Sequence, residues 1–365
     1  MTATLAAWVH SLDPWIVQFT PTFGIRWYGV SYLLGFAMAY FVLLRLSKTG
    51  RSLIPAERLP DAMMWLVGGV LIGGRLGYVL FYQPSLFVQF DGSFPFWGVL
   101  AINQGGMASH GGIAGVIVAS VRIARGWRAQ DGSIVGRAPV LHVTDLVALV
   151  APIGLFLGRI ANFINGELLG RIVAGAGERA PWWSVRYPQE LLGWNAPGVR
   201  VEGEHTPALT LAQQDELTGL VLKVRQPDDT YPRAIDRLIE HAGEFSAELA
   251  RVVSARHPSQ LYQAAAEGIA VGVALWLIWC KPRRPGVIGA WFLIVYGALR
   301  IVTEFYRLPD AHLIAPRIAG LSRGQWLSVA MIVAGMLLLV WRRTRPDEPL
   351  GGWRRAQSVA PDSSN

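Results

Sequence analysis

Seven long stretches of the chain are dominated by apolar residues. A helix needs about 20 mostly apolar residues to cross a bilayer, because unpaired backbone groups are too costly in hydrocarbon. Trp or Tyr stands at many ends of these stretches, which is typical of side chains at a membrane interface. The pattern predicts transmembrane helices over Trp27–Leu46, Ala62–Tyr82, Met107–Ala124, Val143–Ile164, Gln260–Cys280, Val287–Phe305 and Gln325–Trp341.

The polar segments between these stretches define the domain organisation. The segment after the fourth stretch is long and rich in Pro and Gly, so we expect it to form a small cap outside the membrane. The predicted fold is an all-α polytopic membrane protein of about seven transmembrane helices with a small extracytoplasmic cap domain. Its parts are an N-terminal extracytoplasmic arm (1–26), transmembrane helices 1–4 (27–165), the cap (166–257), transmembrane helices 5–7 (258–342) and a disordered cytoplasmic tail (343–365).

One helix is predicted within the cap. Apolar residues recur there at helical spacing, with charged residues between them. We expect their common face to pack on the membrane surface or on the rest of the cap. These residues are Ile235, Leu238, Ile239, Ala242, Phe245, Leu249 and Val252.

The distribution of Lys and Arg predicts the orientation. The loops at 45–58, 122–137 and 281–284 and the segment 342–355 are rich in these residues, whereas Arg26 and the loop at 307–323 contribute few. Cytoplasmic loops carry an excess of positive charge. The N-terminus is therefore expected outside the cytoplasmic membrane and the C-terminus in the cytoplasm.

Composition supports a membrane protein and excludes other classes. Apolar residues make up 52% of the chain and charged residues only 16%, against about 25% charged in soluble proteins. The net charge of +8 is explained by the cytoplasmic loops, so we expect no nucleic-acid partner. The single cysteine, Cys280, excludes a disulfide framework. The histidines lack metal-ligand spacing, so neither a metal nor another cofactor is expected.

Several ionisable residues lie inside the predicted helices, where charge is costly and marks a functional interior. Arg159 follows about 15 residues after the inner end of its helix, at about 1.5 Å per residue, which places it in the outer half of the membrane. The same reasoning gives one level in the outer leaflet to Tyr28, Arg75, His110, Arg159, Glu267, Arg300 and Glu304.

Arginines outnumber carboxylates at this level. Arg300, Glu304 and Arg307 share one helix face, and two of them can neutralise each other as an ion pair. Arg307 and the arginines of other helices would then leave positive charge unbalanced by buried carboxylates. The planar guanidinium group suits phosphate, so the unbalanced positive charge predicts an anionic ligand. A phospholipid head group is the nearest available anion.

Two motifs surround these charges with glycine. Close helix packing explains the glycines of GRIANFINGELLGR, but not its Arg159, Asn162, Asn165 and Glu167. The second motif, QGGMASHGG, contains His110. A histidine at the end of a helix can be structural, or it can take up a proton near neutral pH.

Six motifs together resemble the bacterial prolipoprotein diacylglyceryl transferases, in the order of that family and across nearly all the predicted helices. They are RWYG at 26–29, GGRLGYVLFY at 73–82, HGG at 110–112, the signature GRIANFINGELLGR at 158–171, HPSQLYQ at 257–263 and YGALRIVTEFYRLPD at 296–310. Between the signature and HPSQLYQ this chain is some tens of residues longer than the usual family form. We expect the extra length to lie within 173–253 and to enlarge the cap.

The resemblance implies an enzyme of the bacterial cytoplasmic membrane, which transfers a diacylglyceryl group from phosphatidylglycerol to the lipobox cysteine in the signal peptide of a prolipoprotein. It implies a thioether product and release of glycerol 1-phosphate, with membrane lipids as the surroundings. Asp145 also matches a family position. The implied catalytic residues are His110, Arg300, Tyr296 and Glu304, and the implied substrate-binding residues are Arg159, Asn162, Glu167, Gly170, Tyr28 and Arg307.

The chemistry of a thiol nucleophile adds to this picture. A thiol with a pKa of about 8.5 is mostly protonated at neutral pH, so a base or a positive field must act on it. Cys280 stands at the opposite end of its helix from the charges, so the thiol must come from a substrate. His110 is the candidate base.

Three other classes of membrane protein are the alternatives: a transporter, a receptor and an intramembrane protease. The sequence contains no internal repeat, HExxH or GxSxG.

Overall fold

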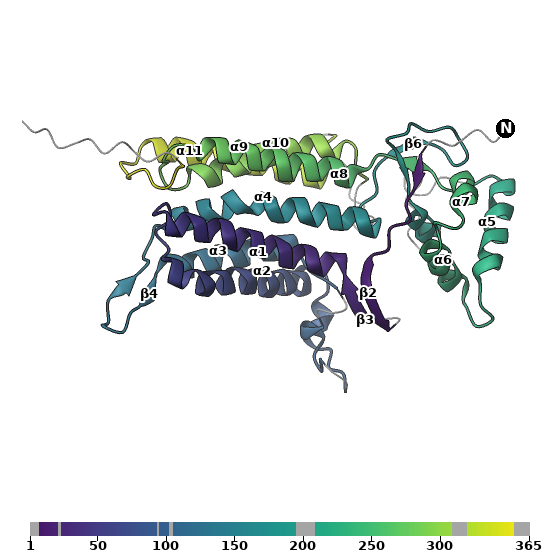
Figure 1. The fold of residues 1–365 in the computed structure, drawn as a ribbon, viewed down its shortest axis with the longest axis horizontal. Helices are drawn as coiled ribbons and strands as arrows, with labels where there is room; N and C mark the ends of the chain where they lie inside the picture. The colour runs from purple at the N-terminus through teal and green to yellow at the C-terminus, as the bar shows by residue number, and fades with distance from the viewer. Residues whose placement is uncertain are drawn as a thin grey trace, which may run out of the picture. The chain divides into compact units, whose positions relative to one another are not determined.

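The computed structural model describes residues 7–20, 23–92, 95–101, 105–194, 209–308 and 320–353. In this part of the chain, six helical segments are long and apolar enough to cross a membrane. They confirm six of the seven predicted transmembrane helices (Figure 1). They are α1 (Trp27–Lys48), η1 with α2 (Ala56–Arg58 and Leu59–Phe81), α4 (Val140–Asn165), α8 with η6 and α9 (Ser259–Gln263, Ala264–Ala270 and Val271–Ile278), α10 (Val287–Glu304) and α11 (Arg323–Arg343).

The third predicted transmembrane helix is shorter than expected. Helix α3 (Ser109–Ala124) has 16 residues, a length of about 24 Å against a hydrocarbon core of about 30 Å. It packs closely against α2 through glycines. A Cβ atom on Gly73 would lie 2.4 Å from the carbonyl oxygen of Gly111, and one on Gly115 would lie 1.9 Å from that of Gly69. Only glycine therefore permits this approach of the two backbones.

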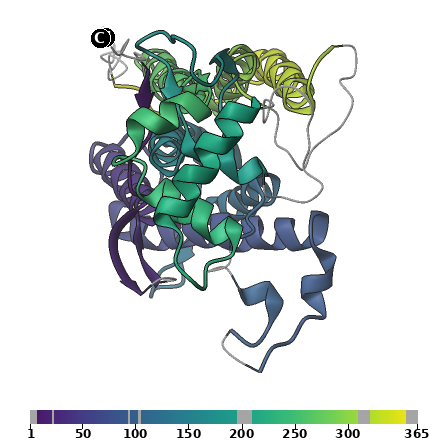
Figure 2. The same ribbon diagram turned by 90° about the vertical axis from the view of Figure 1, so that its right-hand side faces the viewer.

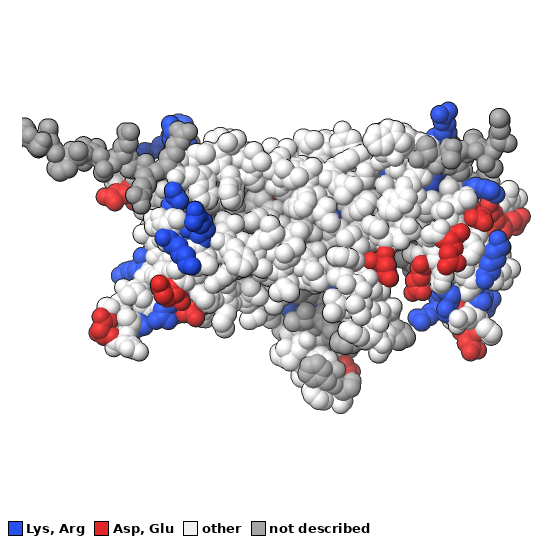
Figure 3. Space-filling view, viewed as in Figure 1, with Lys and Arg blue, Asp and Glu red and all other residues white. Residues whose placement is uncertain are grey.

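The chain divides into two compact units. The first consists of Met1–Leu34, Gly154–Val271 and Val295–Ile332, and the second of Gly35–Ile153, Gly272–Ile294 and Val333–Asn365. The described residues of the first unit include the segment predicted as a cap. Those of the second include α2, α3 and the positively charged helix ends beside the hairpin of β4 (Trp127–Arg128) and β5 (Ile134–Val135) (Figure 3).

The predicted cap segment has a hydrophobic core of its own. Helices α5 (Leu211–Val224), α6 (Tyr231–Glu240) and α7 (Ser246–Val252) surround it, and Leu238 and Leu249 are fully buried there (Figure 2). The single helix predicted for this segment is wrong, because a turn separates α6 from α7. The apolar face does pack on the rest of the segment, and the charged side chains lie outside (Figure 3).

Short strands and 3₁₀ turns, which the hydrophobic pattern did not predict, join these helices. In the first unit, a four-stranded sheet has the order β1-β7-β8-β6, with β1 parallel to β7 and the other pairs antiparallel. The strands are β1 (Trp8–Val9), β2 (Trp15–Thr20), β3 (Phe23–Arg26), β4 (Trp127–Arg128), β5 (Ile134–Val135), β6 (Ile172–Ala174), β7 (Val185–Arg186) and β8 (Ala255–Arg256), and the turns are η2 (Pro84–Phe87), η3 (Gly98–Leu100) and η5 (Pro188–Trp194).

Asp145 has a structural role in the second unit. Its carboxylate accepts hydrogen bonds from the backbone nitrogens of Gly286 and Gly289, both at 2.7 Å. These nitrogens belong to the start of α10, where backbone N–H groups have no partner within the helix. Asp145 therefore caps α10 from α4 and links the two helices.

The chain beyond α11 continues as an ordered segment to Trp353, whereas the sequence predicts disorder from 343 onward. Leu350 and Arg283 exchange two backbone hydrogen bonds of 2.8 and 3.0 Å, and the ring of Trp353 lies 5.0 Å from that of Trp276. Arg51 donates to the carbonyl oxygen of Trp353 at 2.6 Å. Residues 354–365 lie outside the described part of the chain.

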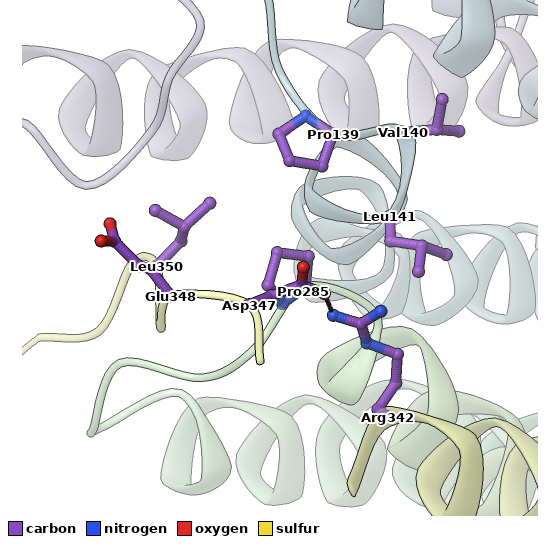
Figure 4. Close-up of a pocket in the computed structure, with 8 residues that line it drawn as sticks. All are labelled: Pro139, Val140, Leu141, Pro285, Arg342, Asp347, Glu348 and Leu350. Carbon is purple, nitrogen blue, oxygen red and sulfur yellow. Dashed lines mark ion pairs between the residues drawn. The ribbon is translucent and has the colours of Figure 1, made fainter. Parts of the chain in front are cut away.

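A cavity of about 330 Å³ lies where this segment meets the ends of α4 and α11. Arg342 points toward Asp347 there and forms an ion pair with it (Figure 4). None of the predicted site residues lines the cavity, which is formed by Pro139, Val140, Leu141, Pro285, Arg342, Asp347, Glu348 and Leu350.

Shortening the chain tests the contribution of this segment to stability. A chain that ends after Arg345 is expected to lose about 1–3 kcal/mol of unfolding free energy, because burial of the Trp353 ring and the hydrogen bond from Arg51 to the Trp353 carbonyl oxygen are lost. Thermal unfolding followed by circular dichroism measures the change. A chain that ends after Trp353 is the control and should melt like the full chain. Equal melting temperatures for both shortened chains would contradict a stabilising role.

A candidate active site built on two arginines

Arg159 of α4 and Arg300 of α10 converge on one carboxylate in the first unit. Glu267 Oε2 accepts hydrogen bonds from Nε and Nη2 of Arg159 at 3.2 and 3.0 Å. Its other oxygen, Oε1, accepts from Nη1 of Arg300 at 3.0 Å and from the hydroxyl of Thr303 at 3.4 Å. Glu304 lies 3.2 Å from Nη2 of Arg300, one turn further along α10. The four charged groups form a cluster drawn from three helical segments.

This cluster corrects the predicted charge balance. The sequence led us to expect arginines that no buried carboxylate neutralises. In the structure, however, Glu267 is fully buried and contacts both Arg159 and Arg300. Within the cluster, the charges of Glu267 and Glu304 balance those of Arg159 and Arg300. The arginine side chains retain 16% and 14% of their exposure, whereas that of Glu267 retains none. The two arginine side chains, and that of Glu304 at 12%, are thus partly accessible, whereas that of Glu267 is not.

Tyrosines surround the arginines. Tyr296 lies one turn before Arg300 on α10, and its hydroxyl is hydrogen-bonded with the side chain of Arg159. The rings of Tyr28 and Tyr32 on α1 lie 5.3 Å apart, and Tyr32 is within electrostatic range of Arg159. The structure therefore places the predicted residues Tyr28 and Tyr296 in the same region as Arg159 and Arg300.

Three polar side chains are hydrogen-bonded to one another at the C-terminal end of α4. Asn162 and Asn165 donate to the two oxygens of Glu167 at 3.2 and 3.0 Å. The backbone nitrogen of Glu167 donates to the carbonyl oxygen of Asn162 at 3.0 Å and so closes the helix end. The Glu167 side chain is exposed, whereas Asn162 is buried. The two amides therefore orient a carboxylate that is open to a ligand.

The signature loop is tied to two other motifs of the sequence. Gly170 pairs with Arg307 as an antiparallel bridge, which Leu308 supports by donating to Leu169 at 3.0 Å. Arg256 donates to the carbonyl oxygen of Gly170 at 3.1 Å. These bonds bring together the segments around 170, 257 and 307, as expected if the motifs build one site.

Arg75 bonds backbone carbonyl groups in the structure. It is buried, and it donates to the carbonyl oxygens of Gly98, Val99, Gly105 and Gly106 at 2.6 to 3.0 Å. Arg75 therefore organises the chain that leads into α3. From the sequence, Arg75 was expected among the arginines available to an anionic ligand, and the structure corrects this.

His110 belongs to the second unit, whereas the arginine cluster belongs to the first. It is the second residue of α3, and its side chain is exposed. The preceding segment is anchored to α2, because Ala108 donates its backbone N–H to Gly74 at 2.8 Å. His110 is therefore held at a fixed helix start with its imidazole accessible.

Two buried polar groups of the first unit were missed from the sequence and have structural roles. Glu190 forms a fully buried ion pair with Arg256, at 2.6 Å. Burial raises the pKa of Glu190, and Arg256 opposes this rise. His10 contacts the carbonyl oxygen of Phe163 at 2.7 Å, and burial lowers its pKa, so that the neutral imidazole ties the N-terminal segment to the end of α4.

Comparison with known proteins decides the family. The family model described as prolipoprotein diacylglyceryl transferase matches residues 14–341. The chain belongs to this family. The phosphatidylglycerol–prolipoprotein diacylglyceryl transferase of Bdellovibrio bacteriovorus is 40% identical over 361 residues, which cover 96% of this chain and 98% of the relative. The proteins of the same name from Chromobacterium violaceum and Nitrosomonas europaea are 36% and 35% identical over 90% and 91% of this chain and 95% and 91% of their own lengths.

Membership of the prolipoprotein diacylglyceryl transferase family confirms the resemblance inferred from the six motifs. The matched range contains every predicted site residue, from Tyr28 to Arg307, together with Glu267. It favours a transferase over the transporter, receptor and protease alternatives. The roles of the individual residues remain a prediction.

Proposed function

We propose that this protein transfers the diacylglyceryl group of phosphatidylglycerol to the thiol of the lipobox cysteine of a prolipoprotein, the first step of bacterial lipoprotein maturation. The thiol sulfur forms a bond to the glycerol carbon, and the bond from that carbon to the phosphate oxygen breaks. The products are a thioether and glycerol 1-phosphate, and the thiol proton passes to a base. The names of the relatives and the family support this reaction.

The observation that carries the proposal is the pair of arginines on one buried carboxylate. The phosphodiester carries one negative charge, and the leaving glycerol phosphate gains a second as the bond breaks. Each guanidinium has five N–H donors, so Glu267 and Glu304 do not exhaust the hydrogen bonds of Arg159 and Arg300. Donors that are already oriented stabilise such developing charge most effectively.

The predicted site residues are proposed to take two roles in this reaction. We assign His110, Arg300, Tyr296 and Glu304 to catalysis. Substrate binding is assigned to Arg159, Asn162, Glu167, Gly170, Tyr28 and Arg307.

His110 is proposed as the base that takes the thiol proton. Its replacement by glutamine should lower the rate of transfer by about 100-fold, the usual contribution of a general base. Single-turnover transfer to a lipobox peptide measures this step. His241→Gln is the matched control, because His241 is an exposed histidine of the turn after α6. Near-normal turnover by His110→Gln would contradict the role of His110 as the base. The positive field of the arginines would then be what lowers the pKa of the thiol.

The reaction is proposed to occur at the outer leaflet of the bacterial cytoplasmic membrane. The arginine-rich loops support an N-terminus outside and a C-terminus in the cytoplasm. Residues 166–257 would then form an extracytoplasmic cap, next to the 1–26 arm. This orientation places the arginine cluster where phosphatidylglycerol and a translocated signal peptide can meet.

Reconstitution tests the proposed function directly. Purified protein in phosphatidylglycerol vesicles is expected to transfer labelled diacylglyceryl to a synthetic lipobox peptide, with release of glycerol phosphate. A peptide with serine in place of the cysteine should accept no label. Absence of transfer in several lipid compositions, by protein shown to be folded, would contradict the proposal.

A further inference from the structure

Glu267 has no assigned role in the reaction, although it touches both arginines. We infer that Glu267 is a positioning residue: it holds the guanidinium groups of Arg159 and Arg300 in the arrangement in which they bind the phosphate. The inference rests on the proposed function. It adds a residue that contacts no substrate itself and acts through two others.

The division of contacts between the two carboxylate oxygens supports this role. Oε2 accepts two hydrogen bonds from Arg159, and Oε1 accepts from Arg300 and Thr303. Since the two arginines lie on α4 and α10, a single carboxylate sets the distance between them. The two donors on Oε2 also fix the direction of the Arg159 plane, because a guanidinium fork is planar and rigid.

Local backbone structure places Glu267 at this point. It lies within η6 (Ala264–Ala270), a π-helical segment between α8 and α9. Such segments are rare and often occur at functional sites. The next residue, Gly268, packs against the backbone of Phe156 on α4, where a Cβ atom would lie 2.5 Å from the Phe156 Cβ. This close approach sets Glu267 beside Arg159, which follows Phe156 by one helical turn.

A comparison within the first unit separates this ion pair from a purely structural one. In the ion pair of Glu190 with Arg256 both side chains are buried, with exposures of 2% and 0%. In the cluster around Glu267, that carboxylate alone is fully buried, and the side chains of both arginines remain partly exposed. A buried carboxylate that bonds two partly exposed arginines is suited to orient them toward a ligand.

The test uses Glu267→Gln, which keeps the shape of the side chain and removes its charge. Vesicle transfer assays should show kcat lowered by about 100-fold, the effect of misplacing a catalytic group by about 1 Å, with a smaller change in KM for phosphatidylglycerol. Glu216→Gln is the matched control, because Glu216 pairs with Arg251 at the surface of the same unit. It should transfer at the unsubstituted rate.

A double-substitution cycle distinguishes positioning from a general structural effect. If Glu267 acts through Arg159, then Glu267→Gln should cost at least about threefold less in an Arg159→Lys background than in the unsubstituted protein. Should Glu267→Gln fold poorly, Glu267→Asp in the same cycle retains the charge and displaces the carboxylate. Its loss of kcat should likewise shrink in the Arg159→Lys background.

Each outcome decides the inference. Normal kcat in Glu267→Gln, or equal losses in both backgrounds, would overturn the positioning role while the proposed reaction stands. Absence of transfer by the unsubstituted protein would instead overturn the proposed function, and the role of Glu267 with it. A lowered kcat with the expected coupling to Arg159 would support the inference.

Discussion

Replacing Arg300 with alanine is expected to lower kcat/KM for glyceride transfer by about 1,000-fold. This corresponds to about 4 kcal/mol of lost transition-state stabilisation, at the upper end for one preorganised donor group. The Arg300 side chain is only 14% exposed and contacts both Glu267 and Glu304. Its removal would deprive the leaving phosphate of a partner and leave two carboxylates nearby with less neutralisation. Both effects oppose the build-up of negative charge.

Substitutions at Arg159 and Arg300 separate charge from geometry. Arg159→Ala should cause a loss similar to that of Arg300→Ala. The lysine variants retain the charge and lose the planar fork, so they should keep only part of the activity. Initial rates with labelled phosphatidylglycerol measure all four variants. Arg251→Ala is the control, since that side chain is 56% exposed and pairs with Glu216 at the surface. Transfer by Arg300→Ala at the rate of this control would contradict the proposed role.

The transmembrane helices were predictable from the sequence because hydrocarbon imposes length and apolarity on every segment that crosses it. The predicted boundaries lie within a few residues of α1, α4 and α10. Helix α3 is the exception, since the preceding residues from Gly105 to Ala108 are not helical. Two of them have positive φ, Gly105 at 85° and Gly106 at 80°, which ends any helical continuation.

The segment predicted as a cap shows where hydrophobic periodicity is insufficient to predict the helices. Apolar residues keep their helical spacing through 241–245, so the pattern runs on where the backbone turns. Gly243 lies in that turn, and Ala242 remains buried in the same core as α6 and α7. A short turn between two helices can keep their apolar residues on one face. The spacing of apolar residues alone therefore does not reveal the turn.

The proximity of Arg159, Glu267 and Arg300 could be predicted, but the pairing of their charges could not. Depth along each helix placed Arg159, Glu267 and Arg300 at one level, because helical rise is regular. Which carboxylate neutralises which arginine depends on the rotation and packing of three helices. The π-helical segment around Glu267 changes that rotation locally. No hydrophobic pattern carried that information, so the arginines were expected to be unbalanced.

Gly170 offers the second large expected effect, because this position has no room for a side chain. A Cβ atom there would lie 2.0 Å from the carbonyl oxygen of His257, a backbone atom that cannot rotate away. The two segments that meet at this contact are held together by hydrogen bonds, since the backbone N–H of His257 donates to Arg171 at 3.0 Å and the Arg256 side chain donates to Gly170 at 3.1 Å. An alanine must therefore push the signature loop away from the segment around His257.

Gly170→Ala is expected to lower kcat/KM by about 100-fold, because the loop would carry Arg307 out of place through the bridge between residues 170 and 307. Overpacking should also reduce the unfolding free energy by about 1–3 kcal/mol. Gly158→Ala is the matched control in the same motif, since its Cβ would meet no heavy atom within 4 Å and alanine favours a helix. Transfer assays and thermal unfolding of the two variants measure both effects. If Gly170→Ala and Gly158→Ala were equally active, the close contact with His257 would not control the geometry of the site.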